Sequence, residues 1–325
     1  MRAWQVVEHG EPKAALSLVD VELPEPGPGQ VRLRVAAAAL GFPDVLMCRG
    51  VYPLTPPLPF IPGQEVAGTV TAIGDGVGIA IGSRVLCVTS FVSGHGGFAD
   101  EALAPERGLV VVPEWMSDAD AAVFSIAYRT AWIGLVRRGG IQPGEWLVVL
   151  GAAGGTGSAA IELGVALGAH VIAVAGGQEK LEYCRRLGAE VLIDHSREMV
   201  PDAVMAATDG HGADLIYDPV GGEAATSATE AMANEGRLLL IGFASGTWPA
   251  LSALDLVRRN FSAVGVFAGA YDRPFDQEMH QSLFAMAEDG RIDAHVTSTV
   301  PFTDLPAGLE ALSDRAALGK YVLVP

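Results

Sequence analysis

The chain has 325 residues, of which 50% are hydrophobic and 18% charged, a composition that suits packed cores and excludes a disordered polymer. One core rarely grows to this size, so we expect two domains. The formal net charge of −17 argues against a nucleic-acid partner, and it leaves any phosphate-bearing cofactor to be held by backbone N–H groups or a few placed cations.

The cellular setting is indicated by what the sequence lacks. No stretch approaches the ~18 uninterrupted apolar residues of a membrane span, and the first residues contain no apolar signal-peptide core. Cys48, Cys87 and Cys184 lie far apart with no C-x-x-C pair, which disfavours both a disulfide framework and a structural zinc lobe. We therefore expect no membrane association and a reduced, cytoplasmic setting.

The first 120 or so residues have the pattern of an all-β region. Short apolar runs at residues 6–7, 31–35 and 66–70 are separated by dense Gly and Pro. Residues 53–62 contain five prolines and must form an extended loop rather than a helix.

From residue 145 onward, apolar β-type runs alternate with helix-length segments. We predict strands at residues 146–150, 170–175, 191–193, 215–218, 237–241 and 261–267, with helices such as 158–167 and 179–187 between them. Six strands joined by crossovers of this length indicate a doubly wound parallel sheet, so the fold class is α/β. A helix at about 276–288 follows, and a closing strand at 321–324 is typical of a segment that returns to pair with the first domain.

The strongest chemical signal is the glycine-rich turn at residues 151–157. It follows the apolar run 147–150 and opens a helix of small residues. Strand, glycine turn and helix together indicate a pyrophosphate site, because glycines let the backbone approach and the helix start offers free N–H groups. The alternative is an ordinary tight turn. The loop residues expected to contact a dinucleotide are Gly154, Gly155, Thr156 and Gly157.

The end of the second strand distinguishes the two nicotinamide cofactors. An NAD site carries an acid there, whereas this strand ends in Gly176 and Gly177. The glycines leave room for a 2′-phosphate, and Lys180 is placed to neutralise it, so we predict NADPH rather than NADH. Glu179 can point to solvent at the first turn of the helix. The alternative for Lys180 is a plain solvated cation.

Several motifs taken together resemble a known family. They are the loop 151–157, YDPVGG at 217–222, GRLLLIGFASG at 236–246, GFPDVL at 41–46 and PGQEVAG at 62–68. Across essentially its whole length the chain resembles the zinc-free quinone oxidoreductase (ζ-crystallin-like) branch of the medium-chain dehydrogenase/reductase superfamily.

The resemblance implies a domain organisation and an assembly. A GroES-like β catalytic domain would be built from residues 1–122 and 267–325, with a Rossmann NADPH-binding domain at 123–266 inserted between them. Nicotinamide and substrate would meet in a cleft between the domains. Two subunits would pair through the strand 261–267, whose apolar edge needs covering.

The residue types at two positions indicate whether the chain binds a catalytic zinc ion. Zinc-dependent relatives place a Cys and a His where this chain has Gly41 and Gln64, and a glycine and a carboxamide cannot complete a tetrahedral N/S site. We therefore expect no metal. Without a strong Lewis acid, hydride transfer is easiest to an acceptor that is already conjugated, most readily a quinone.

The resemblance also implies roles for single residues. Tyr52 and Tyr128 are the candidate proton donors, and the alternative is that each only forms a wall of the site. For cofactor binding the resemblance points to Gly41, Phe42, Thr130, Ile241, Gly242, Phe243 and Phe267 on the nicotinamide side, to Asp218 and His195 on the adenosine side, and to Gly177, Lys180 and Arg315 at the 2′-phosphate. Three positions depart from the family pattern and bear on the choice of acceptor: Gly41 replaces a usual asparagine, Arg129 a usual glycine and Ala268 a bulkier residue.

Two other functions stay open. The first is an NADPH-dependent reductase of enoyl thioesters, alkenals or enones, which uses the same metal-free hydride transfer. The second is a non-catalytic nucleotide-binding structural or RNA-binding protein, as some ζ-crystallin relatives have become. The net charge of −17 speaks against RNA.

Overall fold

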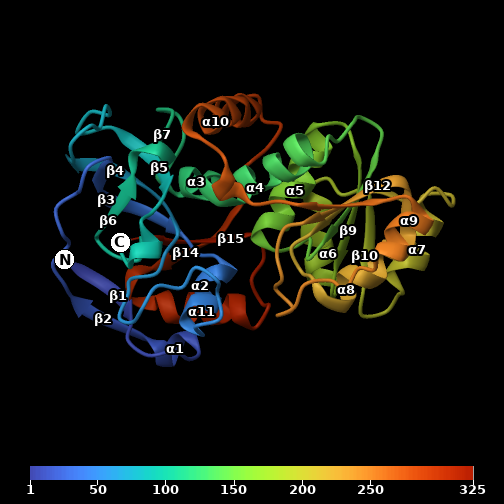
Figure 1. Ribbon diagram of the computed structural model, residues 1–325, viewed down its shortest axis with the longest axis horizontal. Coiled ribbons are helices and arrows are strands. Elements are labelled where there is room, and N and C mark those ends of the chain that lie inside the picture. The colour runs from blue at the N-terminus through green and yellow to red at the C-terminus, as the bar shows by residue number, and fades with distance from the viewer. Residues whose placement is uncertain (325) are drawn as a thin grey trace. The chain divides into compact units, whose positions relative to one another are not determined.

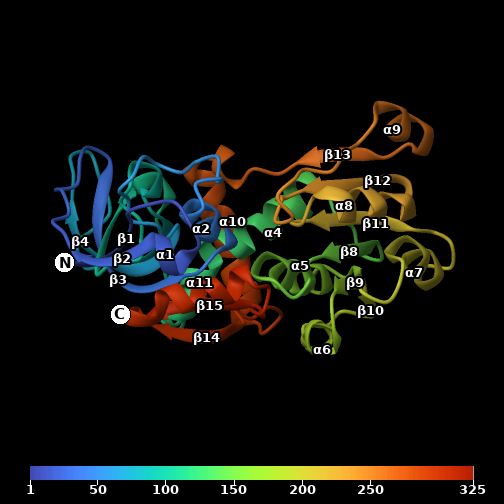
Figure 2. The ribbon, with the colours of Figure 1, turned by 90° about the horizontal axis from the view of Figure 1, so that it is seen from below.

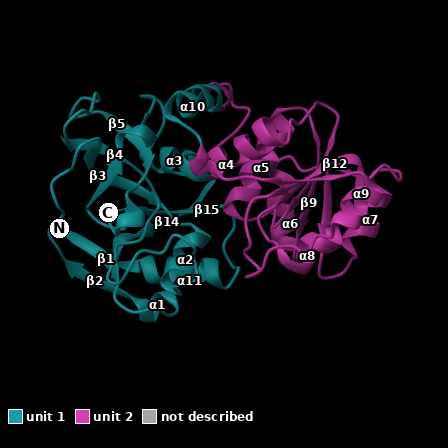
Figure 3. Cartoon of the chain, in the orientation of Figure 1, with its two compact units in different colours: residues 1–126, 271–284, 294–325 teal, residues 127–270, 285–293 magenta. Residues whose placement is uncertain are grey.

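The structure is a computed structural model that describes residues 1–324, and the chain divides into two compact units (Figure 3). Unit 1 comprises Met1–Ile126, Tyr271–Phe284 and the chain from Ala294 onward, and unit 2 comprises Ala127–Ala270 and Ala285–Asp293. From the sequence we predicted domain boundaries after residues 122 and 266, and we did not predict the return of the chain to unit 2 at Ala285–Asp293. The catalytic and cofactor-binding roles of the two domains stay a prediction.

Unit 2 is built on a six-stranded sheet with the order β10-β9-β8-β11-β12-β13, in which every pair is parallel. Figure 2 shows the strands following one another in this order. The winding runs from β8 to β10 in one direction and from β11 to β13 in the other, so the predicted doubly wound sheet is confirmed. The strands are β8 (Trp146–Leu150), β9 (His170–Ala175), β10 (Val191–Asp194), β11 (Ala213–Asp218), β12 (Met232–Leu240) and β13 (Ser262–Gly265).

The helices of unit 2 connect these strands. Because β8 and β9 are apolar runs buried on both faces, α5 packs directly on them, and α6 packs on β9 and β10. Two π-helical turns, Phe124–Tyr128 and Ile133–Arg138, flank α4 close to the change between the units. The helices are α4 (Arg129–Trp132), α5 (Gly155–Ala166), α6 (Gln178–Arg186), α7 (Val200–Ala207), α8 (Gly222–Ala228) and α9 (Ala253–Arg259), with a 3-10 turn at Thr229–Ala231 and another at Ala268–Ala270.

Unit 1 is centred on a mostly antiparallel sheet with the order β14-β15-β3-β4-β5-β7, and β6 also pairs with β3 (Figure 1). A separate pair, β1 with β2, lies beside it. The closing strand β15 pairs with β3, as predicted for the C-terminal run. The strands are β1 (Arg2–Val6), β2 (Leu16–Asp20), β3 (Gln30–Ala39), β4 (Glu65–Ile73), β5 (Arg84–Val88), β6 (Glu101–Pro105), β7 (Val110–Val111), β14 (Val296–Pro301) and β15 (Lys320–Val324).

The helices of unit 1 are short apart from one. Pro43 lies in the first turn of α2, where its missing N–H costs nothing, and the proline-rich stretch that follows at residues 53–59 forms turns and bends, as predicted. The helices are α1 (Pro12–Ala15), α2 (Phe42–Cys48), α3 (Asp118–Val123), α11 (Leu305–Ser313) and α10 (Arg273–Glu288), which belongs to unit 2 from Ala285 onward. There are 3-10 turns at Phe91–Ser93, Glu106–Gly108 and Phe302–Asp304.

Each unit has a hydrophobic core of its own. The core of unit 1 gathers side chains from β3, β4, β5 and α11, and the core of unit 2 gathers side chains from β8, β9, β11 and β12. Two cores agree with the expectation from chain length. Within residues 1–324, no helix is long and apolar enough to cross a membrane.

The predicted element boundaries were wrong mainly at strand ends. The run predicted at 261–267 yields only the four-residue β13, because the chain turns into a 3-10 segment after the Val266 N–H bonds to the Leu240 carbonyl. Two other strands, β11 and β12, begin earlier than predicted, at Ala213 and Met232. Their extra residues include Gly and Asn, which the apolar pattern could not assign to a strand.

Candidate functional site

The glycine-rich loop follows β8 and turns directly into α5. Gly154 caps the helix in an extended conformation, and Gly155 is its first residue. A side chain at Gly157 would place its Cβ 2.5 Å from the Gly151 carbonyl oxygen, so only glycine allows this close approach of helix and loop. Gly154 is exposed, and Gly155 and Thr156 are half-buried. The free N–H groups at this helix start therefore face a surface that can take a phosphate.

The loop lies where the winding of the sheet reverses, between β8 and β11. A Cβ at Gly151 would lie 3.0 Å from Val220 Cγ2, so the loops after these two strands are in contact. The loop after β12 joins them, because the Ala244 N–H bonds to the Pro219 carbonyl and the Ser245 N–H to the Val220 carbonyl. Ligands of doubly wound sheets bind at this edge, outside the carboxyl ends of the strands.

Asp218 organises the end of β11. Asp218 is fully buried, and its Oδ1 accepts hydrogen bonds from the N–H groups of Val220, at 2.9 Å, and Gly221, at 2.8 Å. Its backbone carbonyl accepts from the N–H groups of Ile241 and Gly242. Burial raises the pKa of Asp218 to about 6, and its Oδ2 has no hydrogen-bond partner within the described chain. The side chain thus shapes the loops at the predicted site.

The end of β9 is an open, acid-free turn. Gly177 has φ of 88°, which glycine adopts without strain, and no atom lies within 4 Å of where its Cβ would be. The Gly176 backbone lies close to the imidazole of His195, since a Cβ there would be 3.0 Å from His195 Nε2. His195 itself is exposed. The structure therefore brings Gly176, Gly177 and His195 together, and their predicted roles in cofactor binding stay predictions.

A carboxylate that was not predicted from the sequence accepts a hydrogen bond from the backbone of this turn. Asp194, the last residue of β10, accepts hydrogen bonds at Oδ1 from the Gly177 N–H at 3.3 Å and from the Ser196 hydroxyl at 2.6 Å. These bonds lower the pKa of Asp194. Asp194 is thus engaged by its own loop, and the end of β9 carries Gly176 and Gly177 where an NAD site carries an acid. Lys180 lies half-buried in the first turn of α6, and Glu179 beside it is exposed.

The other predicted cofactor contacts are spread over both units. Thr130 is buried on α4, Phe243 is half-buried with its ring 5.0 Å from that of Trp248, and Phe267 is exposed just after β13. Arg315 belongs to unit 1, where it follows α11 with φ of 57°. The roles predicted for these residues stay predictions.

Tyr128 lies deep inside unit 2. Its side chain is 1% exposed, and its hydroxyl bonds to the Glu162 carboxylate and to the Asp293 carbonyl. Burial and the charge of Glu162 raise the pKa of Tyr128 well above its ordinary value. These contacts tie α5 to the segment Ala285–Asp293. They suit the structural alternative for Tyr128 better than the role of a proton donor.

In unit 1, a buried carboxylate connects the start of α2 to the turn before β4. Asp44 is 1% exposed. Its Oδ2 accepts from the Gly41 N–H at 2.9 Å, and its Oδ1 accepts from the Gly63 N–H at 3.1 Å. Burial, with a further effect from Glu65, raises the pKa of Asp44 to about 7.

A second buried acid lies next to it. Glu65 forms an ion pair with Lys320, whose ammonium also donates to the Leu40 carbonyl at 3.1 Å. Burial raises the pKa of Glu65, and Lys320 opposes that rise. The pair joins β4 to β15, so the C-terminal strand contributes directly to this part of unit 1.

Tyr52 is half-buried in the loop after α2. Burial raises the pKa of its phenol, and interaction with the Gln64 side chain opposes that rise. The surrounding segment, residues 50–64, contains no charged residue and no histidine. It exposes three apolar side chains, Val51 (59%), Leu54 (37%) and Leu58 (38%). This part of unit 1 thus presents a neutral, apolar surface beside a phenol.

Glycine and glutamine occupy the two positions at which zinc-dependent relatives carry metal ligands. The Gln64 amide is buried with its Nε2 3.5 Å from Met47 Sδ, and Gly41 offers no side chain. Across residues 1–324, no group of three His, Cys, Asp or Glu side chains is placed to hold a metal ion.

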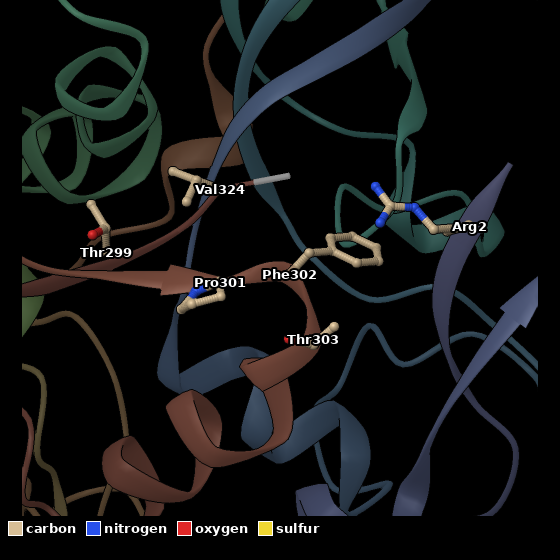
Figure 4. Close-up of a pocket in the computed structure, with 6 residues that line it drawn as sticks. All are labelled: Arg2, Thr299, Pro301, Phe302, Thr303 and Val324. Carbon is tan, nitrogen blue, oxygen red and sulfur yellow. The ribbon is translucent and has the colours of Figure 1, made fainter.

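A small pocket in unit 1 lies where β14 and β15 end. Figure 4 shows its lining by Arg2, Thr299, Pro301, Phe302, Thr303 and Val324. The Arg2 guanidinium lies over the Phe302 ring and is paired with Asp100 at 2.7 Å, so its charge is already neutralised. The pocket contains none of the residues that the sequence assigned to the site.

Comparisons with known proteins fit this architecture. Residues 27–114 match the alcohol dehydrogenase GroES-like domain, and residues 155–288 match a family described as zinc-binding dehydrogenase. A quinone oxidoreductase-like protein 2 homolog from Nematostella vectensis is 35% identical over 303 residues, which cover 91% of this chain and 82% of that protein.

Two solved structures are similar over the full chain. A quinone oxidoreductase from Pseudomonas syringae has a TM-score of 0.91 and 30% identity, covering 100% of this chain and 99% of that one. A mycobacterial protein solved in complex with NADPH has a TM-score of 0.93 and 28% identity, covering 100% of both chains. The chain belongs to the zinc-free quinone oxidoreductase branch of the medium-chain dehydrogenase/reductase superfamily, and its GroES-like and Rossmann parts are confirmed.

Proposed function

We propose that this oxidoreductase uses NADPH to reduce a neutral conjugated acceptor without a metal, a quinone above all. The observation that carries the proposal is the glycine loop at the reversal of the sheet, next to a β9 end that has no acid. When bound, NADPH supplies a hydride. The residues of unit 2 that we assign to its binding are Gly154, Gly155, Thr156, Gly157, Gly176, Gly177, Lys180, His195 and Asp218.

The preference for NADPH rests on space and charge. The Cβ position of Gly177 is open, and Asp194 is engaged by its own loop, so a 2′-phosphate finds room at this turn. Lys180 in the first turn of α6 supplies the compensating charge. The mycobacterial relative in complex with NADPH supports the same choice.

The acceptor class follows from what the chain supplies. With Gly41 and Gln64 at the positions of the zinc ligands, an isolated carbonyl would lack its Lewis acid, whereas a conjugated acceptor needs only hydride and a proton. Hydride from the cofactor and one proton convert a quinone to its hydroquinone. We assign Tyr52 to orient the acceptor or to deliver that proton, since its phenol is only half-buried.

The apolar segment 50–64 helps to choose between acceptors. It offers no cation for the phosphates of a coenzyme A thioester, so we favour a quinone or an uncharged enone. We also propose a cytoplasmic enzyme, in line with three free, buried cysteines. Finally, we propose a homodimer through β13, near which Leu254, Val257 and Phe267 are exposed.

A panel of acceptors tests this function. The purified protein is given NADPH with 9,10-phenanthrenequinone, benzoquinones, short enones and an enoyl-CoA, and NADPH oxidation is followed. We expect turnover with the quinones, weaker turnover with the enones and the least with the enoyl-CoA. Oxidation at background with every acceptor would favour the non-catalytic alternative, and fastest turnover with the enoyl-CoA would replace the quinone by a thioester.

A further inference from the structure

Within the described chain, Asp44 is the one carboxylate that bonds both to the segment of unit 1 that holds Phe42, predicted on the nicotinamide side, and to the segment that holds Gln64, which interacts with the Tyr52 phenol. Its two oxygens accept from Gly41, which precedes Phe42, and from Gly63, which precedes Gln64. Gly41 and Gly63 are 22 positions apart in sequence, and both bonds end on the same 1%-exposed side chain. The geometry of Phe42 and Gln64 therefore depends on one carboxylate.

The surroundings of Asp44 leave its charge without a direct counter-ion. Four ionisable groups face it: Glu65 on β4, Lys320 on β15, Cys48 on α2 and Tyr52 in the loop that follows. Lys320 is bound to Glu65 and to the Leu40 carbonyl, so Asp44 receives only the two N–H donors. Cys48 and Tyr52 have raised pKa values and are neutral near pH 7.

We propose that Asp44 is a positioning residue whose ionised carboxylate holds Phe42 and Gln64 in the arrangement that acceptor reduction requires. This inference rests on the proposed function. Protonation of Asp44 converts one oxygen from an acceptor into a hydroxyl, so one of the two N–H bonds is lost and one segment is released. Because burial raises the pKa of Asp44 to about 7, this change falls near neutral pH.

The sign of the pH dependence makes the proposal distinctive. Reduction of a quinone consumes a proton, so chemistry alone favours turnover at low pH. Loss of the Asp44 charge acts in the opposite direction, because the released segment no longer holds the acceptor side in place. Turnover that falls as the pH drops through about 7 therefore points to positioning rather than to proton supply.

The test compares the pH profiles of kcat/KM for the quinone in wild type, Asp44→Asn and Asp118→Asn between about pH 5.5 and about pH 8.5. Asn copies the protonated acid, since its amide accepts at only one atom. We expect the wild-type value to rise roughly tenfold with pH and Asp44→Asn to stay flat near the low-pH value of wild type. Asp118 is a surface carboxylate of unit 1 that pairs with Arg84, so Asp118→Asn should keep the wild-type profile.

Three outcomes separate the possible failures. An Asp44→Asn profile that rises with pH as wild type does overturns the positioning role and leaves the function intact. A wild-type protein that reduces no acceptor overturns the function, and the inference with it. If Asp44→Asn does not fold, amide hydrogen exchange of wild type decides: we expect Gly41 or Gly63 to exchange faster below about pH 7 after correction for intrinsic rates, and unchanged protection contradicts the proposal.

Discussion

At the scale of single residues, each unit contains a buried carboxylate that organises the backbone around it. Asp218 accepts two N–H bonds behind the loops of unit 2, and Asp44 does the same in unit 1. Both have raised pKa values because burial disfavours their charged forms. Asp218 accepts from Val220 and Gly221 in the structure, and its predicted contact with the cofactor stays a prediction.

Some residues of the site could not be found from sequence. The glycines at 151–157 and those at 176–177 each carry a local signal, because each run lies within a single turn. Lys320 has no such signal, because its partner Glu65 lies 255 positions away and only the sheet order brings β15 close to β4. Asp44 was part of a recognised motif, but its role depends on Gly63, which is distant in sequence.

The two tyrosines give a prediction at this scale. Tyr128→Phe removes a hydroxyl that bonds to Glu162 and leaves that buried carboxylate with fewer partners, so we expect a loss of about 1–3 kcal/mol in the free energy of unfolding. Turnover of the folded variant should stay close to wild type. Tyr52→Phe should do the reverse: similar stability, with kcat lowered about tenfold or more.

Thermal or urea unfolding and steady-state kinetics on the same preparations check both variants. A large fall in kcat for Tyr128→Phe without loss of stability would restore the proton-donor role that its burial argues against. Unchanged kcat for Tyr52→Phe would reduce that residue to a wall of the site, the alternative that the sequence left open.

At the scale of elements, the apolar runs predicted where strands lie better than where they end. β8 and β9 coincide with the predicted ranges because both are buried on both faces and bounded by Gly or charged residues. β13 is shorter than its apolar run, because the chain leaves the sheet after Val266 and turns into a 3-10 segment. An apolar residue at an edge fits a strand and an interface equally well, and the sequence pattern does not separate the two.

The edge of β13 gives a prediction about assembly. The Val266 N–H donates to the Leu240 carbonyl of β12. Because the N–H groups of successive strand residues point to opposite edges, the Ala263 N–H points to the edge away from β12. Ala263→Pro removes that N–H and keeps the pairing with β12. We expect the dimer of wild type to become a monomer in analytical ultracentrifugation, with the secondary structure retained.

Met199→Lys serves as the control, since Met199 is an exposed apolar residue of unit 2 far along the chain from β13. It should leave the dimer intact. A dimeric Ala263→Pro variant would exclude this edge as the interface, and a monomeric wild type would exclude the homodimer itself.

At the scale of the whole molecule, length and composition predicted two cores, and the structure has one in each unit. The doubly wound sheet also followed from the alternation of strands and helices, whereas the place of the glycine loop beside the reversal of strand order comes from the structure. The return of Ala285–Asp293 to unit 2 did not, because it depends on contacts such as that of Tyr128 with the Asp293 carbonyl. The net charge of −17 agrees with a small-molecule acceptor held by an uncharged segment.

The central claim is metal-free, NADPH-selective reduction, and one measurement tests it most directly: the ratio of kcat/KM for NADPH to that for NADH, with 9,10-phenanthrenequinone and chelator-treated protein. We expect a ratio of about ten or more in wild type and Arg185→Ala, and a ratio near one in Lys180→Ala; Arg185 is an exposed cation on the same helix. A wild-type ratio near one, or activity that is lost on chelation and restored by zinc, would contradict the account.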